Sequence, residues 1–213
     1  MNTACVIAST LDRHLQVPTE IVVFGSAALL LDRDLALRLS GRMTNDIDVI
    51  VPSGRELAID ADSQFWDAIK ATNRELEEKK LYLTHIFPER EVVLTPEWKQ
   101  FLVPLPNPKL RKLRLFRPRI LDLVVSKMGR GDLQDQADIR TMLTLQREIR
   151  LVAPSAAEIA EAAKCAMVPD VYREIFSRAA AQVLDCVRQL ERGEPLSPPG
   201  HAHRQNLGYG PRP

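Results

Sequence analysis

Two aspartates lie two residues apart in an otherwise apolar run, and their spacing suits the binding of a cation. Asp46 and Asp48 lie within residues 44–51, which are rich in isoleucine and valine and predict a strand. Alternate residues of a strand share a face, so both carboxylates point the same way, roughly 7 Å apart. Carboxylates in an apolar strand need a positive partner, and Mg²⁺ prefers oxygen ligands. We predict a metal site at Asp46 and Asp48; the alternative is a strand end at which they are turn residues.

A short turn lies upstream, between a predicted strand and a predicted helix. Residues 20–24 are mainly β-branched, Gly25-Ser26 follows, and residues 27–31 predict the start of a helix. Glycine lets a backbone approach a ligand closely, and the free N–H groups of a helix start favour phosphate oxygens. We expect Gly25 and Ser26 to bind a phosphate group, with Ser26 as the N-cap or as a phosphate donor. The alternative is an ordinary strand-to-helix connection that binds nothing.

These two motifs together resemble the nucleotidyltransferase superfamily related to DNA polymerase β. Its pattern is Gly-Ser or Gly-Gly, a helix, and then Asp-x-Asp on the next strand, as in Gly25-Ser26 and Asp46-Ile47-Asp48. Within the superfamily the chain looks most like AbiEii-type toxins and related bacterial nucleotidyltransferase-like domains of unknown function. Those proteins carry a lysine on a later helix and a segment Lys-Asp-Leu-x-Asp, which Lys127, Asp132-Leu133 and Asp135 resemble.

The resemblance implies a fold and a set of partners. The fold is α+β: a nucleotidyltransferase fold with a small mixed sheet flanked by helices, and a C-terminal helical appendage. The implied substrate is an NTP, and a toxin-like or phage-defence role suggests RNA, perhaps tRNA, as acceptor and a cognate antitoxin as a further partner. Many members also carry a third carboxylate on a later strand. This sequence has no clear counterpart, and two alternatives stay open: Glu91, or no third carboxylate at all.

The resemblance also implies a mechanism. Asp46 and Asp48 hold Mg²⁺ against the NTP, and an acceptor hydroxyl attacks the α-phosphorus so that pyrophosphate leaves. Lys127 binds and stabilises the phosphates, and Asp135 supports Lys127 or the attacking hydroxyl. Two alternatives stay open: a non-catalytic nucleotide- or protein-binding module that retains the fold, and a small-molecule nucleotidyltransferase of the antibiotic-modifying kind.

Residues 120–145 predict two helices separated by Gly129-Arg130-Gly131. Lys127 lies off the centre of the first helix's apolar stripe, so we expect it to reach outward. Asp132 is the predicted N-cap of the second helix, and Asp135 and Asp138 follow on the same side.

A basic segment precedes these helices. Residues 109–119 hold six cations among leucines and predict a short strand. Two interpretations stay open: contact with a triphosphate or an RNA backbone, and an edge strand that its charges keep soluble.

The middle of the chain predicts structural elements. Residues 55–80 indicate a helix with a break near 60–62, and residues 81–87 and 92–94 indicate strands. We interpret His85 and Trp98 as packing residues. The alternatives are that His85 lines the site and that Trp98 stacks on a base.

Composition and the C-terminal part complete the prediction. With 213 residues, 45% hydrophobic content and a net charge of +1, the chain suits one sizeable core. We predict a nucleotidyltransferase-like domain over 1–150, a helical appendage over 151–193 and a disordered tail over 194–213. Ser155 opens a capping box, and the second appendage helix has an apolar stripe of Val171, Ile175, Ala179, Val183, Val187 and Leu190. No segment predicts a membrane span or a secretory leader, so we expect a cytoplasmic protein with three reduced packing cysteines.

Overall fold

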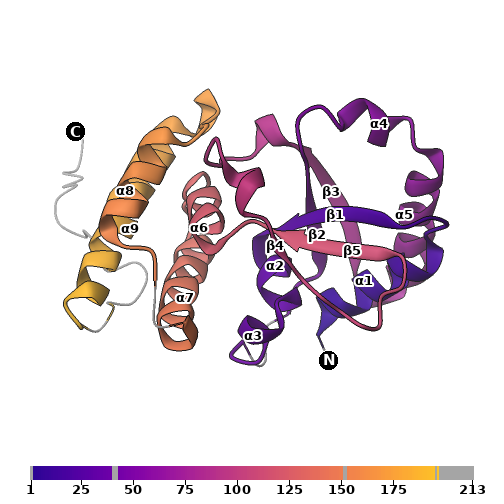
Figure 1. Ribbon diagram of the computed structural model, residues 1–213, viewed down its shortest axis with the longest axis horizontal. Coiled ribbons are helices and arrows are strands. Elements are labelled where there is room, and N and C mark those ends of the chain that lie inside the picture. Colours follow the sequence, from indigo (N-terminus) through magenta and orange to yellow (C-terminus); the bar gives the residue numbers. More distant parts are fainter. Residues whose placement is uncertain (1, 40–42, 151–152, 195, 197–213) are drawn as a thin grey trace, which may run out of the picture.

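The computed structural model describes residues 2–39, 43–150, 153–194 and 196, which build a mixed sheet with helices around it. The five strands lie in the order β3-β2-β1-β5-β4 (Figure 1). β1 is antiparallel to β2 and parallel to β5, β2 is parallel to β3, and β4 is antiparallel to β5. The strands are β1 Thr19–Phe24, β2 Asp46–Val51, β3 Tyr82–Pro88, β4 Val103–Pro104 and β5 Leu113–Arg117. This architecture confirms the predicted α+β fold.

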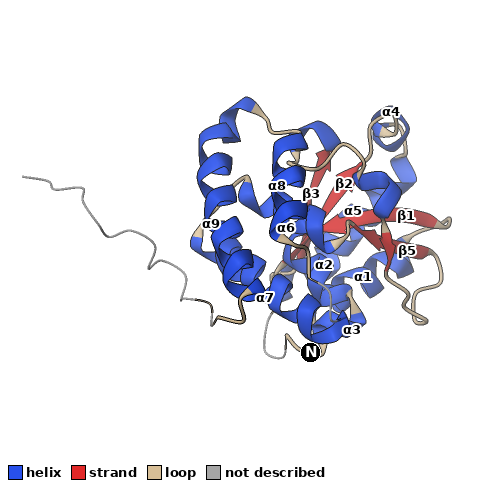
Figure 2. Ribbon diagram, turned by 60° about the vertical axis from the view of Figure 1, so that its left-hand side comes forward, coloured by secondary structure: helices blue, strands red, loops and turns tan. Residues whose placement is uncertain are grey.

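The helices form two groups. α1, α2 and α5 pack against the sheet, whereas α6 and α7 form a helical group with α8 and α9 (Figures 1 and 2). The α-helices are α1 Thr3–His14, α2 Gly25–Leu31, α3 Arg33–Ala36, α4 Glu56–Asp60, α5 Ser63–Leu76, α6 Ile120–Met128, α7 Leu133–Arg150, α8 Ala156–Cys165 and α9 Arg173–Glu191. The 3-10 helices are η1 Glu77–Lys79, η2 Glu89–Glu91, η3 Trp98–Phe101 and η4 Asp170–Tyr172.

Strand alternation divides the core between the two faces of the sheet. One face of β1 and β2 packs in the large core with the helices, and the other packs on a small cluster of residues 92–98. Ile47 and Val49 belong to the large core, whereas Ile50 belongs to the small cluster. Asp46 and Asp48 alternate with Ile47 and Val49, so they lie on the face of β2 that is turned away from that large core.

The predicted elements of the middle region are partly confirmed. The helical break near 60–62 is present, because α4 ends at Asp60 and Asp62 caps α5 by accepting a hydrogen bond from the N–H of Phe65. The strand predicted at 92–94 is wrong: these residues form an irregular segment, in which Leu94 makes an isolated bridge with Met167. They are apolar because they cover the second face of the sheet. The helix α1 was not predicted.

Several residues of the basic segment, 109–119, make contacts that hold β5 in the fold. β5 lies between β1 and β4, so the edge-strand interpretation is wrong. Asp12 of α1 accepts hydrogen bonds from three successive backbone N–H groups, those of residues 111–113. Arg117 is buried and forms an ion pair with Asp32, with 2.6 Å between Nη2 and Oδ2.

The C-terminal helices pack against α6 and α7. The capping box at Ser155 is confirmed. The apolar stripe of α9 is only partly confirmed: Val171 is 78% exposed and Ile175 43% exposed, whereas Ala179, Val183 and Val187 are buried. The reason is that residues 170–172 form the separate turn η4, so the buried face of α9 begins only at Phe176. The predicted tail, 194–213, lies outside the described residues except for 194 and 196.

Two further predictions concern cysteines and membranes. Cys5, Cys165 and Cys186 are free thiols, but Cys165 is exposed and is therefore not a packing residue. None of the helices in the described part of the chain is long and apolar enough to cross a membrane.

Glu89 connects three segments beneath the second face of the sheet. Its carboxylate accepts hydrogen bonds from the Ser53 backbone N–H, the Trp98 indole and the Lys99 ammonium, at 2.6, 2.8 and 3.0 Å. Burial by itself raises the pKa of Glu89, but these hydrogen bonds outweigh burial and lower that pKa from 4.5 to about 2. The stabilisation from Glu89 is therefore complete above about pH 4.5 and is lost as the pH falls toward 2.

We expect Glu89→Gln to lower the free energy of unfolding at pH 7 by about 1–3 kcal/mol, because it removes the charge from three hydrogen bonds. Denaturant titration at pH 7 and pH 3 measures the effect, and the difference from wild type should shrink at pH 3. Glu97→Gln, at an exposed position of the same segment, is the matched control. An equal loss at both pH values would contradict the assigned role of the Glu89 charge.

Candidate active site

A cavity of about 260 Å³ collects the predicted site residues from separate parts of the chain. Gly25 at the start of α2, Asp46 and Asp48 on β2, and Lys127 near the end of α6 all line it. The remaining lining residues come mainly from β3, from the segment after it and from the Gly129-Arg130 turn, and Tyr172 comes from η4. The full set is Phe24, His85, Phe87, Glu91, Val92, Val93, Ser126, Gly129, Arg130 and Tyr172. Ser26 and Asp135 are not among the lining residues.

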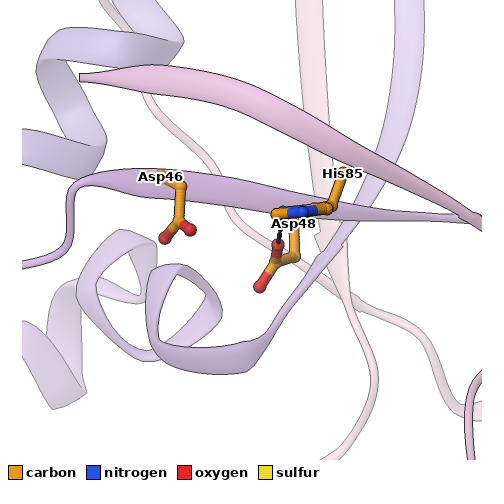
Figure 3. A group of neighbouring side chains, drawn as sticks. All are labelled: Asp46, Asp48 and His85. Atoms are coloured by element: carbon orange, nitrogen blue, oxygen red, sulfur yellow. Dashed lines mark ion pairs between the residues drawn. The ribbon is translucent and has the colours of Figure 1, made fainter. Parts of the chain in front are cut away.

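Asp46 and Asp48 lie beside an imidazole (Figure 3). Asp46, Asp48 and His85 each offer one ligand atom, and these three atoms lie within 4.8 Å of one another. Nδ1 of His85 is 3.3 Å from Oδ1 of Asp48. Thr44 donates its hydroxyl to Asp46 at 3.0 Å, which orients that carboxylate. The three side chains therefore form one cluster of candidate metal ligands at the cavity.

The interpretation of His85 as a packing residue is wrong, and a β-bulge is the reason. Asp46 and Ile47 pair with Tyr82 and Leu83, but Asp48 pairs with His85, so Thr84 is the extra residue. One extra residue moves every later side chain of β3 to the opposite face. The bulge therefore places His85 on the carboxylate face of the sheet, where its ring stacks on Phe87 with 5.3 Å between ring centroids.

Gly25 is required at its position by its backbone angle and by the space available. Its φ is +64°, a region that side-chain-bearing residues rarely adopt. A Cβ at this position would lie 3.1 Å from Oδ2 of Asp48. The glycine thus lets the junction of β1 and α2 pass close to the carboxylate pair.

The electrostatics of the carboxylate pair suit a cation. Burial raises the pKa of Asp48, and the neighbouring charge of Asp46 raises it further, while His85 and Arg130 act in the opposite direction. A divalent cation would relieve the repulsion between the two carboxylates. The paired carboxylates fit Mg²⁺, which takes oxygen ligands, whereas ligation by the His85 imidazole would favour Mn²⁺ or a later transition metal.

Lys127 lies in a buried ion cluster, so the expectation that it reaches outward is wrong. Its side chain is 5% exposed, and its Nζ lies 2.8 Å from Asp135 and 2.6 Å from Asp138. Both carboxylates are fully buried on α7. The sequence stripe of α6 did not reveal this, because the partners of Lys127 come from another helix.

Ser26 lies inside α2, so the prediction that it is the N-cap is wrong. The N-cap position of α2 is Phe24, whose side chain makes no capping bond. The Ser26 hydroxyl instead donates to Oδ2 of Asp138 at 3.2 Å. Its side chain is therefore part of the buried network behind the cavity.

Asp132 and Asp135 have the relative positions that the sequence indicated. Asp132 accepts a hydrogen bond from the N–H of Asp135 at 2.7 Å, as an N-cap does. Asp135 accepts from Lys127 and also from Nε and Nη2 of Arg130, both at 3.1 Å. Sequence reasoning named no role for Arg130, although its place between two glycines after a helix was a usable signal. Glu91 is exposed and lines the cavity but lies outside the three-residue ligand cluster.

A mixed sheet that carries Asp-x-Asp on the strand after a glycine turn and helix defines a nucleotidyltransferase-like protein. Residues 5–152 match the family described as "Nucleotidyltransferase of unknown function (DUF6036)", and the chain belongs to that family. No curated protein and no solved structure matches the chain significantly. The finer resemblance to AbiEii-type toxins stays a prediction.

Proposed function

We propose that this protein transfers a nucleoside monophosphate from an NTP to an acceptor hydroxyl in a Mg²⁺-dependent reaction. The observation that carries the proposal is the convergence of Gly25, Asp46, Asp48 and Lys127 on one cavity. The family match supports nucleotidyl transfer at the level of the reaction class. RNA, with tRNA as one form of it, is the proposed acceptor, and a cognate antitoxin is a further proposed partner of a toxin-like protein.

The residues have separate proposed roles. Asp46 and Asp48 would hold Mg²⁺, which neutralises phosphate charge when it is bound. The backbone N–H groups at the start of α2, around Gly25 and Ser26, would bind phosphate oxygens. The Ser26 hydroxyl does not take this role, because it donates to Asp138. Lys127 adds a fixed positive charge at the cavity wall, and Asp135 holds Lys127 in place.

The reaction forms a bond between the acceptor oxygen and the α-phosphorus and breaks the bond from that phosphorus to the bridging oxygen, so pyrophosphate leaves. Asp135 is fully buried and does not line the cavity, so we assign it the support of Lys127 and not contact with the attacking hydroxyl. Glu91 is the third carboxylate among the described lining residues, and we assign it the role of general base.

Incubation with Mg²⁺, each α-³²P-labelled NTP and total bacterial RNA tests the proposal. We expect label in RNA with the wild-type protein and none with the Asp46→Asn, Asp48→Asn double variant. A thermal shift with Mg²⁺-NTP but no transfer to RNA or small hydroxyl compounds would support the alternative, a non-catalytic nucleotide-binding module. Transfer to a small hydroxyl compound alone would point to the antibiotic-modifying kind of enzyme.

A further inference from the structure

We infer that Arg130, in the turn between α6 and α7, contacts the triphosphate directly, and that Lys127 is a positioning residue behind it. This inference rests on the proposed function and deepens it, because it assigns the phosphate contact within the same cavity. Four observations support it: the burial of Lys127, the exposure of Arg130, the geometry of the Asp135 carboxylate, and the packing of the two flanking glycines.

Lys127 is held too firmly to move toward a ligand. It is enclosed between Asp135 and Asp138, both fully buried, and its own side chain is 5% exposed. If the ammonium moved toward a phosphate, the two carboxylates would stay in the low-dielectric interior with a weaker ion pair to Lys127. Such a loss is strongly unfavourable. The lysine therefore fixes the two carboxylates in place, and these in turn hold Arg130 and Ser26.

Arg130 has the opposite character. Its side chain is 70% exposed, and the residue lines the same cavity as Asp46 and Asp48. Asp135 accepts hydrogen bonds from Nε and Nη2, which fixes the plane of the guanidinium. A guanidinium has five N–H donors, so three remain for a ligand, and its fork geometry matches phosphate oxygens. The Arg130 guanidinium can therefore donate to a ligand in the cavity while it keeps its hydrogen bonds to Asp135.

Arg130 and the carboxylate pair line one cavity. A triphosphate whose metal ion is held by Asp46 and Asp48 would therefore have its outer phosphates in the electric field of the guanidinium.

Two glycines fix the backbone of the turn that carries Arg130. A Cβ on Gly129 would lie 2.9 Å from a methyl carbon of Val93, so only glycine allows this approach to the segment after β3. Gly131 has φ +60°, and a Cβ there would lie 3.2 Å from Ala179 of α9. The turn is thus packed between the cavity wall and the C-terminal helix, which sets the position of the guanidinium.

Calorimetric titration of the full chain with Mg²⁺-NTP and with the matching NMP tests the inference. We expect Arg130→Ala to weaken NTP binding by about 10- to 100-fold and to leave NMP binding nearly unchanged, because a charge-assisted hydrogen bond to the outer phosphates is lost. Arg130→Lys should fall between wild type and Arg130→Ala. Arg188→Ala is the matched control, since this exposed arginine on α9 pairs with Asp185 and does not line the cavity.

Comparing NTP with NMP affinity separates the two roles of Arg130. Loss of a phosphate contact would weaken NTP binding alone, whereas loss of a structural role would weaken NTP and NMP binding equally. Equal NTP affinity in wild type and Arg130→Ala would overturn the inference and leave the proposed function standing. A parallel loss of NTP and NMP affinity would also overturn it. A wild-type protein that binds no NTP in the presence of Mg²⁺ or Mn²⁺ would overturn the proposed function and this inference together.

Discussion

Replacement of both Asp46 and Asp48 by asparagine should reduce nucleotidyl transfer by about 10³-fold or more and leave the fold intact. The loss follows from the several kcal/mol of transition-state stabilisation that a bound metal supplies, at a tenfold change in rate for each 1.36 kcal/mol. Asparagine keeps the shape of aspartate but removes the charge that a divalent cation requires. Release of labelled pyrophosphate from γ-³²P-NTP, measured alongside transfer to the acceptor, gives the rate.

The same double variant should not lose stability. Burial and the charge of Asp46 raise the pKa of Asp48 in the folded protein, so the ionised carboxylate is unfavourable above that pKa. Its neutral replacement should leave the free energy of unfolding at pH 7 equal to that of wild type or slightly higher. Added Mg²⁺ should stabilise wild type only.

Two exposed aspartates provide the matched control. Asp60 on α4 and Asp67 on α5 lie outside the cavity, and their double replacement by asparagine should change neither transfer nor the response to Mg²⁺. Transfer that survives in the Asp46, Asp48 double variant would remove the carboxylate pair from the mechanism. A large loss of stability in that variant would mean that the pair is structural.

Lys127→Met should cause the largest loss of stability of any single substitution considered for this protein. The change leaves Asp138 and Asp135 fully buried without their shared ammonium, and breaking a buried ion pair in this way costs about 3–5 kcal/mol. Asp135 keeps Arg130 as a second cation, and Asp138 keeps the hydrogen bonds from Ser26 and Gln134. Denaturant titration at neutral pH measures the free energy of unfolding.

Two further variants make the result specific. Lys164→Met changes an exposed lysine of α8 that pairs with Glu161, and such a surface change should stay within about 0.5 kcal/mol of wild type. The triple variant Lys127→Met, Asp135→Asn, Asp138→Asn removes the charges together and should recover much of the stability that Lys127→Met loses. Similar small losses for Lys127→Met and Lys164→Met would contradict a buried ion cluster.

Local patterns in the sequence were enough for the elements that carry the carboxylates and the turn. The isoleucine- and valine-rich residues 44–51 predicted a strand with Asp46 and Asp48 on one face, and the structure has a strand over Asp46–Val51. The glycine break at 129–131 and the Asp132 cap were likewise predicted and are present. These features depend on the preferences of neighbouring residues, which a sequence records directly.

The tertiary structure decided which side chains meet. Lys127 is buried because α7 brings two carboxylates against α6, and no periodicity within α6 contains that information. His85 faces the carboxylates because β3 pairs with β2 through a bulge, a register that belongs to two strands and not to one. Patterns of neighbouring residues were thus enough to predict the strand, the glycine turn and the candidate metal ligands. Contacts between distant elements determine that Lys127 is enclosed, that Ser26 binds Asp138 and that Arg130 lines the cavity.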